Sequence, residues 1–194
     1  MRIHLIRHGM TVANEQKLYC GATDLPLSET GIADLIRLRD QGIYPNHTDG
    51  SLFFTSGLLR TDHTLDLLYS PEHRHVLPQL AEFNFGSFEM QSYEMLKNHS
   101  DYQAWITDET GEVGCPGGDS KQNFMSRVLK GYEILTGNQT PDTDIFAVCH
   151  GGVIACIMEY LCPNSRNFYE WQPNPGRGYT LVYISGKLDR YETI

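Results

Sequence analysis

The stretch MRIHLIRHGMTVAN, residues 1–14, decides the fold class that the sequence predicts. Residues 3–6 form a short apolar run, interrupted only by a histidine, that is typical of a buried strand, and the run ends at Arg7-His8-Gly9. In α/β proteins, sites are built at the carboxyl ends of the strands. We therefore expect Arg7 and His8 to lie at such an edge, where Gly9 lets the backbone turn sharply or approach a ligand closely.

A second stretch ends in the same way. Residues 144–149, DIFAVC, are the clearest buried strand in the chain, and they are followed by His150-Gly151-Gly152. Residues 153–161 are apolar enough to form the next helix. Because helix amino termini present unpaired N–H groups and a positive dipole, this end of the sheet is suited to an anion.

The rest of the chain alternates strand and helix signals, as expected of an α/β fold. Ser28 is a suitable N-cap for a helix that ends near Gln41-Gly42. A core-facing helix is indicated by apolar residues spaced four, four and three apart at residues 124–135. The remaining expected elements are a strand at 51–55, an amphipathic helix at 58–68 that carries Arg60, a weaker strand at 74–80, a helix at about 93–106, a loop at 136–143 and a hairpin at 179–184 and 188–194.

Length and composition indicate one domain, residues 1–194, with an excursion from the sheet at about 84–123. Hydrophobic residues make up 40% of the chain and charged residues 20%, which is ordinary for a globular protein. The formal charge of −9 disfavours nucleic acid and anionic membranes as partners, because the field of the protein would repel them. A small phosphorylated ligand remains compatible with this charge.

The five cysteines show no CxxC pair, so the sequence suggests neither a disulfide framework nor a zinc site. No stretch approaches the ~18 apolar residues of a membrane span, and the amino terminus lacks a long apolar signal region. We therefore interpret the protein as cytoplasmic, with reduced thiols and no bound metal.

Two arginines and two histidines are expected to meet at the carboxyl edge of the sheet: Arg7, His8, Arg60 and His150. Each arginine can donate two hydrogen bonds to phosphate oxygens. Four such groups at one point would repel each other without an anion between them. The ligand that this cluster predicts is phosphate.

The same residues lie in motifs that resemble the histidine phosphatase superfamily, which includes cofactor-dependent phosphoglycerate mutases, fructose bisphosphatases and α-ribazole phosphatases. The motifs occur in the family's order from residue 3 to about 160. They are Ile6-Arg7-His8-Gly9 with Thr11 and Asn14, Asp24-Leu-Pro-Leu-Ser28 with Gly31, Ser56-Gly-Leu-Leu-Arg60-Thr, Glu82 with Gly86 and Glu89, and Cys149-His150-Gly151-Gly152.

This resemblance implies a three-layer sandwich, with a mostly parallel central sheet flanked by helices and a helical lid insertion. It also implies that His8 is the nucleophile that becomes phosphohistidine and that Glu82 donates a proton to the leaving alkoxide. His150 would be the third catalytic residue. The implied phosphate-binding residues are Arg7, Asn14, Arg60 and Gly151, and the chemistry requires no cofactor.

Three positions depart from the family pattern. Met10 stands where glutamate or glutamine is usual, Phe88 where tryptophan is usual, and Asp119 where the motif Pro-x-Gly-Glu-Ser has glutamate. None of them is one of the four phosphate residues. Met10 leaves the polar contacts at the edge of the phosphate pocket open.

Among the activities of the family, the excursion favours a phosphatase. Residues 84–123 contain seven acidic residues against Lys97 and Lys121, which would repel a second anionic group on a substrate. The stretch from Phe83 to Val128 resembles α-ribazole phosphatases, and the aromatic residues of the excursion suit a bulky, uncharged leaving group by stacking. These aromatic residues are Phe85, Phe88, Tyr93, Tyr102 and Trp105. For Trp105 and the tyrosines nearby, packing within the lid is an equal alternative that stays open.

The expected reaction is therefore hydrolysis of a small phosphomonoester, with α-ribazole 5′-phosphate as a suggested substrate. Two alternatives stay open at this point. One is phosphotransfer of the phosphoglycerate mutase type, and the other is a catalytically silent regulator that binds a phosphorylated ligand. The expected partner is a small-molecule phosphate ester, and a homodimer is left open as the assembly.

Overall fold

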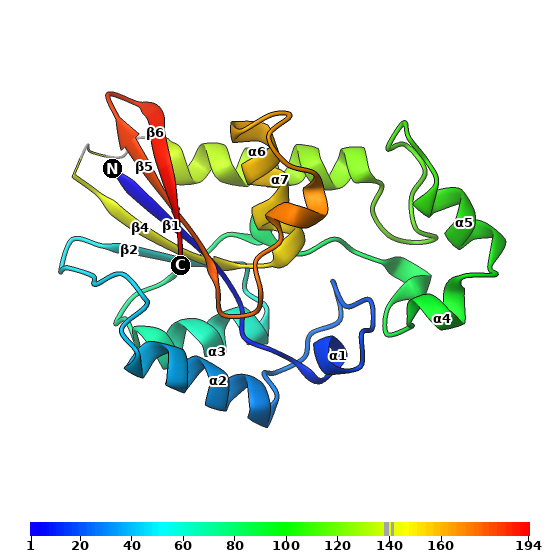
Figure 1. Cartoon of the computed structure of the whole chain (residues 1–194), viewed down its shortest axis with the longest axis horizontal. Coiled ribbons are helices and arrows are strands. Elements are labelled where there is room, and N and C mark those ends of the chain that lie inside the picture. Colours follow the sequence, from blue (N-terminus) through cyan, green and yellow to red (C-terminus); the bar gives the residue numbers. More distant parts are fainter. Residues whose placement is uncertain (138–139, 141) are drawn as a thin grey trace.

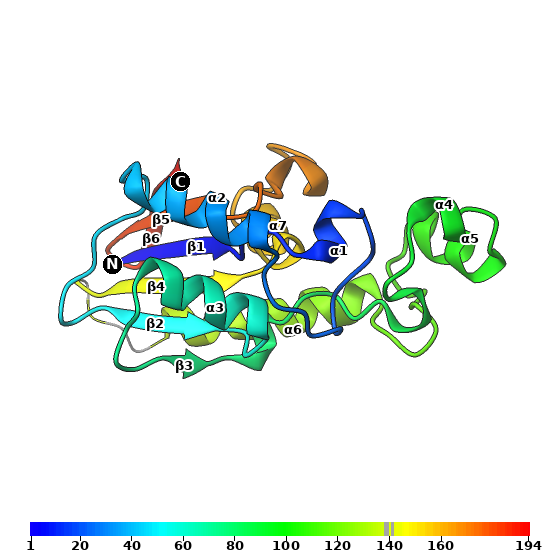
Figure 2. The ribbon, with the colours of Figure 1, turned by 90° about the horizontal axis from the view of Figure 1, so that it is seen from below.

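A six-stranded sheet with the strand order β3-β2-β4-β1-β5-β6 forms the centre of the molecule (Figures 1 and 2). The computed structural model describes residues 1–137, 140 and 142–194. The neighbours β3/β2, β2/β4 and β4/β1 are parallel, whereas β5 runs antiparallel to both β1 and β6. The strands are β1 (Arg2–Arg7), β2 (Leu52–Thr55), β3 (His75–Val76), β4 (Asp144–Cys149), β5 (Gly178–Ile184) and β6 (Lys187–Thr193). The sheet is thus mostly parallel, with the predicted hairpin at one edge.

The two strands that end in His-Gly lie side by side. β1 and β4 pair in parallel from Arg2↔Asp144 to Arg7↔Cys149, so both strands reach the same edge of the sheet in register. Every residue of β4 is buried. This burial explains the continuous apolar sequence, because both faces of a parallel sheet are covered.

Helices cover both faces of the sheet and complete the three predicted layers (Figures 1 and 2). Side chains alternate between the faces along each strand. Ile3 and Leu5 share a core with α6 and α7, whereas Ile6 packs with Leu65 of α3 on the opposite face. The helices that form these layers are α2 (Glu29–Asp40), α3 (Leu59–Leu68), α6 (Lys121–Thr136) and α7 (Gly151–Leu161).

The helix signals at Ser28 and at residues 124–135 are confirmed. The Ser28 hydroxyl accepts a hydrogen bond from the N–H of Gly31 at 3.1 Å and caps α2. Phe124, Val128, Tyr132 and Leu135 are all buried on α6. None of the described helices is long and apolar enough to cross a bilayer.

Two element predictions are wrong in part. The strand expected at 74–80 is limited to His75–Val76, because Pro78 has no N–H for a ladder and begins the 3₁₀ helix η1 (Pro78–Leu80). The helix expected at 93–106 is two short helices, α4 (Tyr93–Leu96) and α5 (Ser100–Ile106). The loop expected at 136–143 includes residues 138, 139 and 141, which lie outside the described residues.

The excursion lies beyond the carboxyl ends of the parallel strands, where Figure 2 shows α4 and α5 extending away from the sheet. It contains η2 (Gly86–Phe88), α4 and α5, and we call residues 84–120 the lid. Phe88, Tyr102 and Trp105 are buried within it and contact each other. The short helix α1 (Val12–Glu15) follows β1 at the same end of the sheet.

Candidate active site

His8 directly follows β1 and is held in one orientation by its own backbone. Its Nδ1 lies 2.6 Å from the carbonyl oxygen of Gly9, and the side chain is buried. A carbonyl can only accept a hydrogen bond, so Nδ1 carries the proton in the neutral ring. The lone pair is then on Nε2. This is the tautomer that a nucleophilic imidazole needs.

His150 directly follows β4 and lies edge-on to His8, with 5.1 Å between the ring centroids. Its Nε2 is 2.9 Å from the hydroxyl of Ser56, at the end of β2. The Ser56 hydroxyl is also 3.1 Å from that of Thr61. Ser56 therefore fixes the orientation of the His150 ring.

The two arginines are anchored by backbone carbonyls. Arg7 donates from Nη1 to the carbonyl of Pro173 at 2.7 Å, and a Cβ at Gly151 would lie only 3.1 Å from the Arg7 guanidinium carbon. Arg60, in the first turn of α3, donates to the carbonyls of Thr23 and Gly21 at 3.0 and 2.7 Å. Each guanidinium keeps further donors for a ligand.

Burial and charge keep both histidines neutral. Burial, together with the positive charges of Arg60 and Arg7, lowers the pKa of His8 well below its usual value. The pKa of His150 is lowered in the same direction, first by burial and then by Arg60. A neutral His8 at pH 7 retains the lone pair that nucleophilic attack requires.

Two buried polar atoms of this cluster have no hydrogen-bond partner among the described residues: Nε of Arg7 and Nδ1 of His150. Buried polar atoms are normally paired, so unpaired ones at a candidate site need an explanation. Both atoms can donate when His150 carries its proton on Nδ1. A phosphate group supplies acceptors for both.

Glu82 enters from the loop that follows η1. Its two carboxylate oxygens accept hydrogen bonds from the N–H groups of Phe83 and Gly152, at 2.9 and 3.0 Å. Gly152 lies in the first turn of α7, which directly follows β4 and His150. Its N–H group therefore holds the Glu82 carboxyl beside the cluster of Arg7, His8, Arg60 and His150, which we call the phosphate cluster.

Asn14 closes the same region from α1. Its amide oxygen accepts from the N–H and the hydroxyl of Thr11, both at 3.0 Å. Its amide nitrogen is therefore the group that remains for a ligand in the cavity that Asn14 lines.

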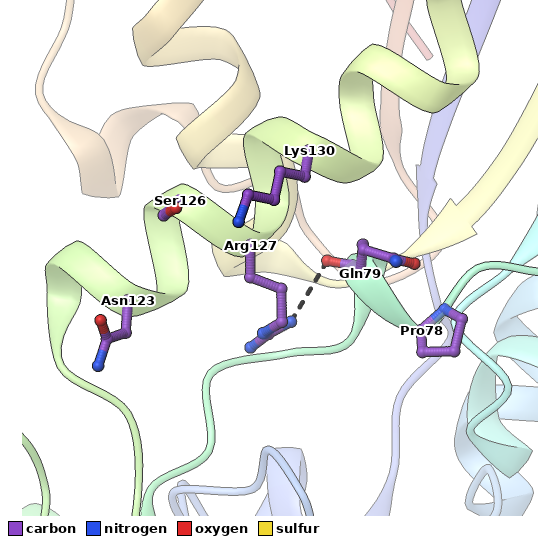
Figure 3. A pocket seen from close by; sticks show the side chains of 6 residues that line it. All are labelled: Pro78, Gln79, Asn123, Ser126, Arg127 and Lys130. Carbon is purple, nitrogen blue, oxygen red and sulfur yellow. Dashed lines mark hydrogen bonds between the residues drawn. The ribbon is translucent and has the colours of Figure 1, made fainter.

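Arg127 of α6 holds the backbone around Glu82 through hydrogen bonds. It donates to the carbonyls of Ala81 and Glu82 at 2.6 and 3.1 Å and forms an ion pair with Asp119 at 2.8 Å. A pocket of about 430 Å³ lies beside α6 and η1. In Figure 3, Arg127 points from α6 toward Gln79, whose carbonyl accepts a hydrogen bond from it at 3.3 Å. Asp119, one of the departures from the family pattern, thus helps to hold the arginine behind Glu82.

Phe88 and Met10, the other two residues that depart from the family pattern, both have structural roles. Phe88 is 1% exposed and packs inside the lid. Met10 contributes its carbonyl, which accepts from the N–H of Ser28 at 2.9 Å before α2 begins.

A cavity of about 790 Å³ extends from this cluster toward the lid. Its sheet end is formed by Arg7, Asn14, Glu82 and Gly152. The aromatic side chains that line it are Tyr19, Phe83, Phe85, Trp105, Phe124, Phe168 and Tyr169. Its acidic lining residues are Glu82, Asp108, Glu109 and Glu159, and its basic ones are Arg7 and Lys121.

Of the five lid aromatics that are suited to stacking on a ligand, Phe85 and Trp105 line the cavity. Phe88 and Tyr102, each 1% exposed, form the interior of the lid, and Tyr93 is 54% exposed outside the cavity. For these three rings the structure favours the alternative that they pack in the lid. A small lid needs a hydrophobic interior of its own, and Phe88 and Tyr102 supply part of it.

Sequence reasoning missed one wall of the cavity. Phe168 and Tyr169 come from the 3₁₀ helix η3 (Phe168–Trp171), in a segment with no regular hydrophobic period. The available signal was a capping box, in which Asn167 and Glu170 bond reciprocally to each other's backbone.

All seven predicted site residues lie at the carboxyl end of the parallel strands: Arg7, His8, Asn14, Arg60, Glu82, His150 and Gly151. Among the described residues there is no group of three or more His, Cys, Asp and Glu side chains that could hold a metal ion. The fold and this cluster define an α/β protein in which two anchored arginines lie with an oriented, neutral histidine at the carboxyl end of the parallel strands.

The chain belongs to the histidine phosphatase superfamily. The sequence model of branch 1 of that superfamily matches residues 3–188. The adenosylcobalamin/α-ribazole phosphatase of Salmonella typhimurium is 32% identical over 166 residues, which cover 83% of this chain and 79% of the relative. A 2,3-bisphosphoglycerate-dependent phosphoglycerate mutase of Lachnoclostridium phytofermentans is 25% identical over 197 residues, covering 83% of this chain and 77% of the relative.

Solved structures agree with the sequence relatives. The crystal structure of a candidate α-ribazole-5′-P phosphatase from Escherichia coli superposes with a TM-score of 0.82 at 27% identity, covering 100% of this chain and 94% of that one. The protein is an enzyme of the phosphoglycerate mutase-like family.

Proposed function

We propose that the protein hydrolyses a small phosphomonoester through a phosphohistidine on His8, with α-ribazole 5′-phosphate as the first substrate to test. The observation that carries this proposal is the lining of the cavity. Four acidic side chains and seven aromatic ones line it, against two basic ones. Such a lining suits an uncharged aromatic leaving group and disfavours a second phosphate or carboxylate.

In the first step, Nε2 of His8 attacks phosphorus in line with the ester oxygen. The P–N bond forms, the P–O bond to the leaving group breaks, and Glu82 gives its proton to the departing oxygen. Arg7, Arg60 and His150 hold the equatorial oxygens, whose charge they stabilise. Asn14 and the amino terminus of α7 at Gly151 add further donors.

In the second step, water attacks the phosphohistidine. The carboxylate of Glu82 takes a proton from this water, the new P–O bond forms, and the P–N bond breaks. The electron pair returns to Nε2 of His8, and inorganic phosphate leaves. Each group is restored, so the cycle needs no further reactant.

The cavity gives this water a route to phosphorus once the leaving group has departed. A mutase must instead retain a second anionic substrate while the phosphoenzyme waits. Among the described residues that line the cavity, Lys121 is the only basic one apart from Arg7, and its ammonium group donates to the carbonyl of Asp108 at 2.7 Å. This arrangement supports hydrolysis over interconversion.

We also propose that the enzyme acts in the cytoplasm. All five cysteines are described in the structure, and all are free thiols. Free thiols are the usual state in a reducing compartment.

The proposal is tested by measuring phosphate release from α-ribazole 5′-phosphate and from a panel of phosphate esters. The interconversion of 2- and 3-phosphoglycerate, primed with bisphosphoglycerate, is measured in parallel. Release faster than interconversion is expected. Interconversion faster than release would establish the mutase reaction instead, and no turnover of any ester would indicate a silent phosphate-binding protein.

A labelling experiment tests the role of His8. Rapid quench without acid, after mixing with ³²P-labelled substrate, should trap an alkali-stable and acid-labile phosphoenzyme. His8→Ala is expected to abolish both label and turnover, whereas the matched control His73→Ala, at an exposed position, should retain both. Label that persists in His8→Ala would remove His8 from the nucleophile's role.

A further inference from the structure

The loop of residues 20–24 lies between the lid and the first turn of α3. Its carbonyls at Gly21 and Thr23 accept both hydrogen bonds that Arg60 makes to the backbone. The carboxylate of Asp24 accepts from the N–H of Leu59 at 2.8 Å. The position of the Arg60 guanidinium therefore depends on where this loop is held.

Glu89 of the lid holds the loop from the other side. Its carboxylate accepts from the N–H groups of Gly21, Ala22 and Thr23 at 2.9–3.2 Å, and from the Thr23 hydroxyl at 2.7 Å. It also accepts from the N–H of Phe85, which lines the cavity, at 3.0 Å.

The side chain behaves as a half-buried anion that its neighbours stabilise. Burial by itself raises the pKa of Glu89, but the hydrogen bonds from Thr23 and from the backbone of Phe85, Ala22 and Gly21 outweigh it and hold that pKa below its usual value. Charge-assisted hydrogen bonds are about twice as strong as neutral ones.

Close packing leaves the loop little freedom to find another position. A Cβ at Gly21 would lie 1.6 Å from the carbonyl oxygen of Phe83, so the loop backbone is in direct contact with the start of the lid. The N–H of Met90 donates to the carbonyl of Tyr19 at 2.7 Å, and the N–H of Tyr19 donates to the carbonyl of Gln91 at 2.9 Å.

We infer that Glu89 is a positioning residue for phosphate binding, which acts by fixing the loop of residues 20–24 and, through its carbonyls, the Arg60 guanidinium. It also ties Phe85 to the same carboxylate. Contact of a leaving group with Phe85 is thereby linked to the arginine that holds the phosphoryl group. The inference rests on the proposed function in taking Arg60 as a phosphate ligand.

The test compares Glu89→Gln with Glu94→Gln, which makes the same chemical change on a lid glutamate that is 71% exposed. Inorganic phosphate is titrated into each protein by calorimetry, and thermal unfolding is followed separately. Glu89→Gln is expected to weaken the phosphate Kd by about tenfold, since hydrogen bonds to charged groups are worth at least that much. Glu94→Gln should leave the Kd unchanged, and Glu89→Asp should recover part of the affinity.

A role in stability alone would lower Tm without changing the phosphate Kd of the folded protein, and that result would overturn the inference. If Glu89→Gln does not fold, Thr23→Val decides the matter, because it removes one hydrogen bond to Glu89 and keeps the carbonyl that Arg60 uses. About threefold weaker phosphate binding is then expected, and an unchanged Kd would overturn the inference.

Action through Arg60 has its own signature. The loss in kcat/KM for p-nitrophenyl phosphate caused by Glu89→Gln should shrink to less than about twofold in the Arg60→Met background, because coupled residues are not additive. A loss of full size in that background would contradict the path through Arg60. A wild-type enzyme that binds phosphate but hydrolyses no ester would refute the proposed function and leave the phosphate-binding test intact.

Discussion

Gly152→Ala tests whether the placement of Glu82 limits the reaction. A Cβ at Gly152 would lie 2.5 Å from Oε1 of Glu82 and 3.2 Å from its carboxyl carbon. An ordinary carbon–oxygen contact is about 3.3 Å or longer. The carboxyl group must therefore withdraw by roughly 1 Å, while the N–H of residue 152 and the rest of α7 keep their positions.

A displacement of about 1 Å at a reacting group can cost about 10²-fold in rate, which is about 2.7 kcal/mol of transition-state stabilisation. The cost should depend on the leaving group, because an acid matters only where the departing oxygen needs a proton. We expect about 10²-fold lower kcat/KM for an alkyl phosphate and less than about fivefold for p-nitrophenyl phosphate.

The assay is phosphate release from both esters, with Gly50→Ala as the matched control. A Cβ at Gly50 meets no heavy atom within 4 Å, so this control should retain both activities. Equal losses for the two esters in Gly152→Ala would show that the substitution damages phosphate binding rather than proton transfer. Unchanged activity toward the alkyl ester would refute the reasoning about Glu82 altogether.

Four further predictions follow from the site and its surroundings. Arg127→Met should lower the free energy of unfolding by about 2 kcal/mol in urea titrations, since it removes donors to the backbone around Glu82; no change would mean that these bonds add nothing. Tyr169→Ala should raise KM for bulky aromatic esters but not for methyl phosphate, because Tyr169 lines the outer cavity; equal effects would remove it from leaving-group contact. Burial, opposed in part by Asp144, lowers the pKa of His4 from 6.5 to about 4. As the pH drops from 6.5 to about 4, His4 is therefore protonated in the unfolded chain before it is protonated in the folded protein, and the free energy of unfolding falls. His4→Gln should reduce this pH dependence of the free energy of unfolding by up to about 1.4 kcal/mol per pH unit, and an unchanged pH dependence would contradict the prediction. EDTA should leave phosphatase activity intact, and a loss restored by a divalent metal would contradict a purely phosphohistidine route.

The strands that carry the site could be predicted because their sequences are unusual. Residues 3–6 and 145–149 are mainly apolar runs that stop at arginine, histidine and glycine, which is the pattern of buried parallel strands with a site at their ends. The location of Arg7, His8 and His150 at the edge of the sheet can be predicted from these strand ends, without knowledge of how the helices pack. Arg60 follows because α3 begins soon after β2.

The parts that the sequence did not reveal depend on contacts between distant segments. Nothing local in Ser56 indicates that its hydroxyl meets His150, 94 positions away. Pro173, whose carbonyl holds Arg7, lies in an irregular segment with no periodicity. The sequence predicts one helix at 93–106, whereas the structure has two, because helix propensity does not mark the break near Lys97, where α4 ends after a single turn.

The two ends of the large cavity are lined by different kinds of secondary structure. Its phosphate end is built on β1, β4 and the start of α7, which are paired and buried, whereas its outer wall is built on the lid, on η3 and on the first turns of α6. In evolutionary terms, the part of the outer wall on η3 can therefore vary without disturbing the groups that transfer phosphorus, whereas the lid is tied to Arg60 through Glu89 and the loop of residues 20–24. A lineage with this fold can acquire new substrates by exchanging loop residues such as Tyr169, while its reaction chemistry is inherited unchanged.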